Sequence, residues 1–260
     1  MWAGIGFLAL LLLFAIFGPH LRHGYLDQNA KPYLAPSSEY WLGTDELGRD
    51  VFARLAFGAR MSLLVGLTVQ AISLIVGITV GVLGVYAPKI IREPIMRFTD
   101  GMFAFPDILL GILIIGVWQR GLLPVIVALT VTSWPSVARL VKSQVASLKD
   151  REFVVASQAV GGSVFYVVTR HVLPQLWGIL LAVSMVDLAG TILAESTLSF
   201  LGIGVQAPDP SWGSMINAAR LNMASQPVAL IWPCLILSVS IFALNFVGDG
   251  LRQWLDPRSQ

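Results

Sequence analysis

The chain has 260 residues, of which 56% are hydrophobic and 12% are charged, and its mean hydropathy is +0.76. Water-soluble domains carry about 25% charged residues, so this composition excludes a soluble globular protein. A net charge of +2 at pH 7 is too small to indicate a nucleic-acid partner. Two stretches, 61–88 and 221–248, contain no Asp, Glu, Lys or Arg, and each exceeds the roughly 20 helical residues that cross a bilayer. The sequence therefore predicts a protein that spans a membrane several times.

The apolar segments, in chain order, predict six membrane-spanning helices. They cover approximately residues 2–18, 61–87, 99–118, 122–142, 175–200 and 227–248. Helices are expected rather than β-barrel strands, because the segments are long and apolar on every face. The first segment lacks the basic start and the cleavage site of a secretory signal peptide, so we expect it to be a retained span. The predicted fold class is an all-α membrane protein with one domain over residues 1–260.

The distribution of Lys and Arg favours a cytoplasmic N-terminus and a cytoplasmic C-terminus. In that orientation the inner segments carry more of these residues than the outer segments, as the positive-inside rule requires. Thr44 or Asp45 is expected to cap a short helix in the first outer loop, and the turn at 208–213 to start another short helix that ends near Arg220. The outer loops would cover about 19–60 and 201–226, and the main cytoplasmic segment about 149–174.

The sequence offers few residues for catalysis. The three histidines, His20, His23 and His171, fall at or beyond the ends of the predicted spans, so an intramembrane nucleophilic or metal site would lack an imidazole. The single cysteine, Cys234, lies in an apolar run and can form neither an intrachain disulfide nor a Cys-based metal site. No Gly-rich phosphate-binding loop precedes a lysine. We therefore expect no catalytic residue, no metal, no cofactor and no ATP hydrolysis in this chain.

The predicted cytoplasmic segment combines small residues with a double glycine. Its pattern predicts a short helix from about Glu152, a break at Gly161 and Gly162, and a second short helix that stops at Pro174. The small side chains would let another backbone approach closely, and Phe153 offers an apolar contact. The segment therefore suits docking onto a partner, although spacing alone also allows a solvated loop between two spans.

The same segment resembles the EAA signature of the permease subunits of bacterial ATP-binding-cassette importers. The resemblance implies that this loop inserts into a groove on the ATPase subunit, with His171 standing where the general pattern has an aliphatic residue. The usual cytoplasmic N-terminal tail of the family is not seen, which suggests a shorter natural start or a truncated sequence. The residues that would couple to the ATPase are Glu152, Phe153, Ala156, Ser157, Gly161, Leu173 and Pro174.

Three further stretches are similar to the C-type permeases of dipeptide, oligopeptide and nickel importers. One is a part of the first outer loop that contains Gly43, Thr44, Asp45, Gly48, Arg49 and Asp50. The others are 195–202 and 245–257, so the resemblance extends over about 39–258 in order. It implies the type I importer permease fold, in the inner membrane of a bacterium.

The resemblance also implies the partners. These are a homologous second permease that completes a heterodimer, two ATPase subunits that hold ATP and Mg, and an extracytoplasmic solute-binding protein. Di- and oligopeptides are the expected cargo, with nickel or a metal chelate as the alternative. A self-sufficient secondary transporter is a further alternative, but it should show inverted repeats with matched broken helices, which the sequence does not display.

Three carboxylates fall in the interior of the predicted spans, where burying a charge is costly, whereas Asp100 lies at the end of the third span. They are Asp107, Asp187 and Glu195. One interpretation places them in a translocation path, lining a cavity that receives a peptide ammonium or a cationic metal chelate. The alternative is a structural role, in which they pair with Arg139 or with another subunit, or lie at the water interface. The sequence leaves both interpretations open.

Small residues along the second predicted span indicate close helix packing. Gly77 and Gly81 are four residues apart, and Gly66 and Gly84 lie on either side of them. Such spacing lets two helices approach closely in a membrane. We expect these glycines to serve packing within the subunit.

Overall fold

Helices dominate the computed structural model, which describes residues 1–255. Five helical segments in that part are long and apolar enough to cross a membrane, and a sixth span results if the bent pair α3 and α4 counts as one. The helices are α1 (Trp2–Phe17), α2 (Val51–Tyr86), α3 (Lys89–Met102), α4 (Asp107–Val117), α5 (Leu122–Leu148), α6 (Glu152–Ala159), α7 (Val164–Val167), α8 (Leu173–Phe200), α9 (Trp212–Leu221) and α10 (Ile231–Leu255). Asp256 and Pro257, which contribute to the last stretch of the family resemblance, lie outside the described residues.

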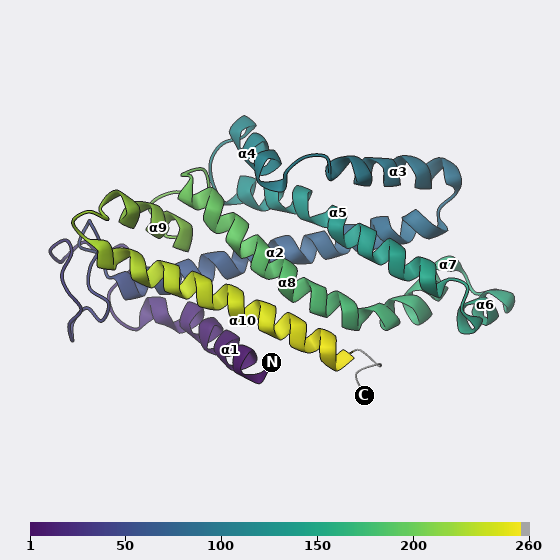
Figure 1. The fold of residues 1–260 in the computed structure, drawn as a ribbon, viewed down its shortest axis with the longest axis horizontal. Coiled ribbons are helices and arrows are strands. Elements are labelled where there is room, and N and C mark those ends of the chain that lie inside the picture. The colour runs from purple at the N-terminus through teal and green to yellow at the C-terminus, as the bar shows by residue number, and fades with distance from the viewer. Residues whose placement is uncertain (256–260) are drawn as a thin grey trace.

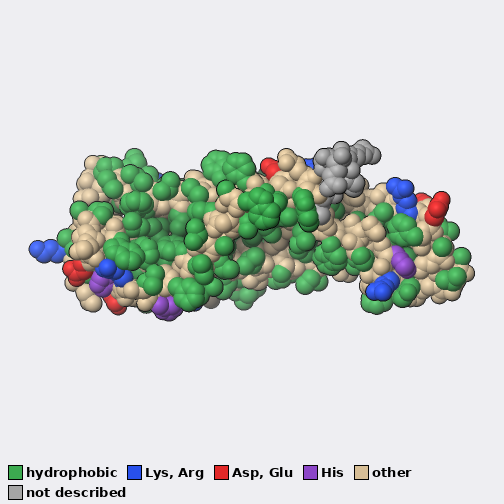
Figure 2. Space-filling view, turned by 90° about the horizontal axis from the view of Figure 1, so that it is seen from below, with side chains coloured by type: hydrophobic (Ala, Val, Ile, Leu, Met, Phe, Trp, Pro, Cys, Tyr) green, Lys and Arg blue, Asp and Glu red, His purple; other side chains and the backbone are tan. Residues whose placement is uncertain are grey.

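The long helices run along one common axis, and the connections between them gather at its two ends (Figure 1). The long loop before α2 lies with α9 at one end, and α6 and α7 lie at the other. Charged side chains are concentrated toward these ends, whereas the middle of the visible face is largely hydrophobic (Figure 2). Exposed apolar residues of the spans include Ile75, Leu113 and Phe242. This distribution suits a bilayer, and the predicted all-α membrane fold is confirmed.

The second span begins earlier than predicted. Helix α2 starts at Val51 and contains 36 residues, so it is about 54 Å long and projects beyond the membrane core. Asp50 caps it, because its carboxylate accepts hydrogen bonds from the backbone N–H groups of Phe52 and Ala53. The prediction of a separate short helix capped by Thr44 or Asp45 is therefore wrong. The charges of Arg54 and Arg60 hide this start in the sequence.

The third span is broken, which the prediction of one helix over 99–118 misses. Helices α3 and α4 meet at an angle of 95° across residues 103–106. Pro106 favours an extended backbone at Phe105 and lacks an N–H to continue the helix. Helix α3 continues back to Lys89 through a segment expected to be a cytoplasmic loop and runs beside α5, and α4 leaves the line of α3 but also packs against α5 (Figure 1).

The remaining spans differ from prediction mainly at their ends. Helix α5 continues to Leu148 rather than ending near 142. Pro174 does not stop a second short helix as predicted: α7 passes through a π-helical turn at Val168–Val172 directly into α8. Because Pro174 lies in the first turn of α8, its missing N–H disturbs the helix little. The short helix expected to end near Arg220 is confirmed as α9.

The glycines of α2 pack against neighbouring helices of the same subunit, as predicted. A Cβ at Gly77 would lie 2.5 Å from Val137, and one at Gly81 would lie 2.6 Å from Val141, so α2 and α5 are in close contact. Gly66 and Gly84 are equally crowded, by Leu188 and Met96.

Replacing Gly77 with leucine is expected to destabilise the bundle by at least about 1–3 kcal/mol, because the new side chain would push α2 away from α5. The matched control is Gly6→Leu on α1, where a Cβ meets nothing within 4 Å. Thermal denaturation of each purified variant in detergent measures its stability. Equal denaturation temperatures of the two variants would contradict the close α2–α5 contact.

Candidate functional site

Residues 149–174, the coupling segment, form an exposed elbow at one end of the bundle. Helix α6 is anchored by Val154, which is fully buried in an apolar cluster with residues of α5 and α8. Glu152, Phe153 and Ala156 are exposed on the same helix. One buried residue thus holds the helix, while the predicted docking side chains remain accessible.

The glycine pair ends α6 in a specific geometry. The N–H of Gly162 bonds to the carbonyl of Ser157 and the N–H of Gly161 bonds to that of Gln158, both at 2.9 Å, which is the Schellman arrangement. Gly161 has a φ of +87°, in the region that favours glycine. The predicted break is confirmed, and its geometry explains why glycine is present there.

The other predicted coupling residues lie on both halves of the elbow, with Ser157 on α6 and Leu173 and Pro174 at the start of α8. Gly161 and Pro174 are exposed, whereas Ser157 and Leu173 are half-buried. Ser163 caps α7 by accepting a hydrogen bond from the N–H of Tyr166. The elbow is therefore built from two capped helical turns with a glycine between them.

Residues 43–50, the outer-loop motif, form a compact turn at the opposite end. Gly43 and Gly48 adopt φ angles of +78° and +74°, and a Cβ on either would collide with a backbone carbonyl. Thr44 accepts a hydrogen bond from the N–H of Leu34 at 2.8 Å and donates to the carbonyl of Lys31 at 2.7 Å. The motif thus ties the loop before it to the start of α2.

Asp45 is the centre of this turn. Its carboxylate accepts hydrogen bonds from the N–H groups of Leu47 and Arg49 and contacts the guanidinium groups of Arg49 at 2.7 Å and Arg54 at 3.2 Å. All three charged side chains are about nine-tenths buried. Asp50, the α2 cap, also contacts His23 at 3.1 Å. The arrangement supports a structural role, since within the described residues the groups that bond to the Asp45 carboxylate belong to the same turn or to the first turn of α2, and the N–H of Tyr33 in the preceding loop donates to the Asp45 carbonyl.

The two outer loops contact each other. The hydroxyl of Tyr25 donates to Asp209 at 3.1 Å, and burial together with the Asp209 carboxylate raises the pKa of Tyr25, which favours the protonated donor. Trp212 at the start of α9 is fully buried, and its indole N–H donates to the carbonyl of Leu55 on α2 at 3.1 Å. The outer end of the bundle is therefore one connected structure.

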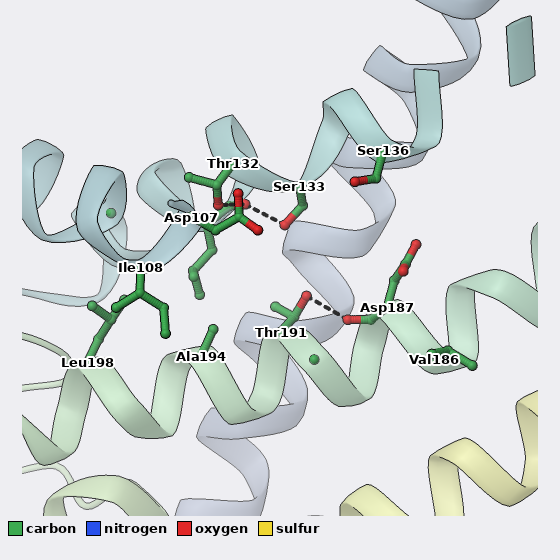
Figure 3. Close-up of a pocket in the computed structure, with 13 residues that line it drawn as sticks. Asp107, Ile108, Thr132, Ser133, Ser136, Val186, Asp187, Thr191, Ala194 and Leu198 are labelled. Carbon is green, nitrogen blue, oxygen red and sulfur yellow. Dashed lines mark hydrogen bonds between the residues drawn. The ribbon is translucent and has the colours of Figure 1, made fainter. Parts of the chain in front are cut away.

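A polar pocket of about 360 Å³ lies between α4, α5 and α8. Asp107 at the start of α4 and Asp187 on α8 both line it, and their side chains extend into the space between the helices (Figure 3). The structure therefore brings together two of the three predicted path carboxylates. Four hydroxyl residues that sequence reasoning missed complete the polar lining: Thr132, Ser133, Ser136 and Thr191.

Glu195, the third predicted path residue, does not line this pocket. Its side chain is fully buried, and its carboxylate accepts hydrogen bonds from Ser199 at 2.7 Å, Ser62 at 3.2 Å and Ser196 at 3.4 Å. Ser199 also accepts a hydrogen bond from the N–H of Val205. Glu195 thus joins α8 to α2 and, through Ser199, to the following outer loop.

Replacing Glu195 with leucine is expected to destabilise the protein by about 2–5 kcal/mol, because three buried hydroxyls lose their acceptor. Glu195→Gln retains one acceptor oxygen and should cost much less. The measurement is the denaturation temperature of each purified variant in detergent. Equal stability of the two variants would show that the carboxylate does not hold these helices together.

Arg139 pairs with Asp100 rather than with a path carboxylate. The two side chains are 2.7 Å apart, and the guanidinium also lies 3.8 Å from the ring centre of Phe103, beside the α3–α4 break. Pairing with Arg139 is one of the alternatives for a structural role of the span carboxylates, and the structure shows Arg139 paired with Asp100 instead. The sequence does indicate a polar face on α5 around Arg139. Ser136, Arg139 and Ser143 recur at helical spacing, and all three are exposed in the structure.

Known proteins show both the fold and the family. The chain superimposes on the inward facing MetNI methionine ABC transporter with a TM-score of 0.63, at 19% identity, over 76% of this chain and 94% of that one. A second crystal form of that transporter gives a TM-score of 0.64 at 18% identity, over 78% of this chain and 96% of that one. The fold is therefore that of an ATP-binding-cassette importer permease.

Sequence comparison narrows the class. Residues 73–260 match the family described as "Binding-protein-dependent transport system inner membrane component". The oligopeptide transport system permease protein OppC of Bacillus subtilis is 36% identical over 260 residues, 98% of this chain and 84% of that protein. The dipeptide permease DppC of the same organism is 38% identical over 98% of this chain and 81% of that protein. The glutathione permease GsiD of Pectobacterium atrosepticum is 35% identical over 97% of this chain and 85% of that protein.

The chain belongs to the family of binding-protein-dependent transport system inner membrane components. It is a multi-pass inner membrane permease subunit, as the resemblance predicts, and it is not an ATPase, since separate subunits hydrolyse ATP in such importers.

Proposed function

We propose that this chain forms half of the translocation pathway for di- and oligopeptides in an ATP-driven importer. The relatives named above are permeases for oligopeptides, dipeptides and glutathione, which favours peptide cargo over the nickel alternative. A homologous second permease would complete the pathway, two ATPase subunits would bind ATP and Mg, and an extracytoplasmic binding protein would deliver the peptide. The α6–α7 end would be cytoplasmic, together with both chain termini.

A polar face on a membrane-spanning helix carries this proposal. Ser136, Arg139 and Ser143 are exposed along α5, and the Arg139–Asp100 pair is more than half exposed. Facing lipid, such a pair would cost several kcal/mol. The opposite face of α5 packs on α2 through Val137 and Val141. We therefore infer that the exposed face lines an aqueous pathway closed by the second permease, with the polar pocket opening onto it.

The coupling segment would connect this pathway to the motor. Glu152, Phe153, Ala156 and Gly161 are exposed at the end of the bundle, while Val154 anchors α6 on α5 and α8. A displacement of the elbow by the ATPase would therefore be transmitted to α5 and α8, two helices that line the polar pocket. The outer-loop motif would shape the opposite end, where the binding protein delivers cargo.

Uptake by cells tests the function. In the native host, deletion of this gene is expected to abolish accumulation of labelled di-, tri- and tetra-alanine, and a plasmid copy should restore it. Accumulation of labelled nickel is measured in the same strains for comparison. Loss of nickel uptake with unchanged peptide uptake would transfer the assignment to the metal alternative.

A further inference from the structure

The polar pocket presents hydrogen-bond acceptors with almost no donors. Thr132 and Ser133 both donate to the carbonyl of Leu129, at 3.1 and 2.7 Å, and Thr191 donates to the carbonyl of Asp187 at 2.9 Å. A hydroxyl has one hydrogen and two lone pairs. These three hydroxyls therefore offer only lone pairs to the cavity, and Ser136, which makes no side-chain hydrogen bond within residues 1–255, can donate or accept.

The two threonine acceptors of the pocket are buried, whereas Asp187 is half-buried and Asp107 is exposed. Thr132 and Thr191 are 9% and 6% exposed and line the cavity, and Figure 3 shows them on opposite sides of it. Within residues 1–255, no hydrogen-bond donor or cation is recorded at the hydroxyl oxygens of these threonines or at the carboxylates of Asp107 and Asp187. Buried acceptors and carboxylates without partners are costly in a membrane protein. A bound group rich in N–H donors would supply what the pocket lacks.

We propose that this pocket binds the primary ammonium group of the cargo, which in a peptide is its α-amino end; this rests on the proposed transport of peptides. An ammonium carries three donors and a positive charge, so it can donate to one of the two carboxylates and to a neighbouring hydroxyl oxygen, while the other carboxylate adds negative charge to the same pocket. A peptide carboxylate, which only accepts, would be repelled. The cargo therefore enters the pocket by its amino end.

The composition of the pocket favours an ammonium over a metal ion. Within residues 1–255, no group of three or more His, Cys, Asp and Glu side chains could hold a metal. The cavity volume of about 360 Å³ lies within the range of small-molecule sites, so a terminal residue with its ammonium fits. Asp107 and Asp187 come from different helices, α4 and α8, which both line the pocket.

The test uses the complete importer, with the second permease and both ATPases, in proteoliposomes supplied with the binding protein. Uptake of labelled di-, tri- and tetra-alanine is measured per ATP hydrolysed. The Asp107→Asn and Asp187→Asn double variant keeps size and polarity and removes only charge, and it is expected to lower this ratio about tenfold or more. Asp187→Glu should stay within about threefold of the wild-type ratio, since it retains the charge.

Glu39→Gln is the matched control, because it removes one carboxylate from an exposed part of the outer loop. Co-purification of the ATPases with each variant verifies folding. A double variant that transports as much peptide per ATP as the wild type would overturn the ammonium site. A wild-type complex that hydrolyses ATP with the binding protein but takes up no peptide would instead overturn the proposed function.

Discussion

Replacing Gly161 with tryptophan is expected to abolish transport while the protein still inserts into the membrane. Gly161 is exposed at the tip of the coupling segment, and a Cβ there meets nothing within 4 Å, so the indole disturbs no internal packing. It would instead occupy the space that an ATPase groove needs, and it would strain a backbone with a φ of +87°. Uptake and binding-protein-stimulated ATP hydrolysis measure the effect.

Backbone strain and bulk can be separated at this position. Gly161→Asn tolerates a positive φ and adds little volume, so it should keep most of the uptake. Glu152→Lys, which reverses an exposed charge on α6, should resemble the tryptophan variant. Normal uptake by well-inserted Gly161→Trp protein would remove the basis for a coupling role.

Replacing Asp45 with alanine is expected to unfold the outer end of the bundle, at a cost of about 3–5 kcal/mol. The guanidinium groups of Arg49 and Arg54 are 9% and 8% exposed, and both contact the Asp45 carboxylate. Without the Asp45 carboxylate, the two buried guanidinium groups repel each other and less negative charge remains beside them. Thermal denaturation in detergent, with proteolysis of the outer loop as a local probe, measures the loss.

Glu46→Ala provides the matched control within the same turn. Within the described part of the chain Glu46 forms one ion pair, with Arg49 at 2.9 Å, and its side chain is 32% exposed. Its removal should cost about 1 kcal/mol or less. An Asp45→Ala variant as stable as Glu46→Ala would contradict the central place of Asp45 in the motif.

The apolar segments of the sequence suffice to predict most spans, because lipid-facing helices must be apolar over their whole length. The spans around α1 and α8 agree within a few residues, and so does the start of the last span. The early start of α2 escapes prediction because Arg54 and Arg60 interrupt the apolar run; in the folded protein Arg54 is paired with Asp45, which is close only in the folded loop, and Arg60 is exposed. The α3–α4 break has a sequence signal in Pro106, but proline occurs inside α3 and α5 as well. Which proline breaks a helix depends on neighbouring packing.

The candidate site was predictable in part. Asp107 and Asp187 are recognisable as charges within spans, yet their convergence on one cavity depends on the bend between α3 and α4. Glu195 carries the same signal and has a different role, because serines from α2 and α8 surround it. The hydroxyls of the pocket give only a weak signal, since threonine and serine often bond to their own helix. Tertiary structure therefore separates a pocket carboxylate from a buried structural one.

Identification of the proteins that co-purify with this chain tests most directly that it works as one subunit of an ATP-driven importer. The chain would be tagged in its native host, extracted in mild detergent and examined by mass spectrometry, with and without cross-linking. We predict recovery of a second, homologous permease together with one or two ATPases. A stable homo-oligomer that lacks both partners even after cross-linking would contradict this account.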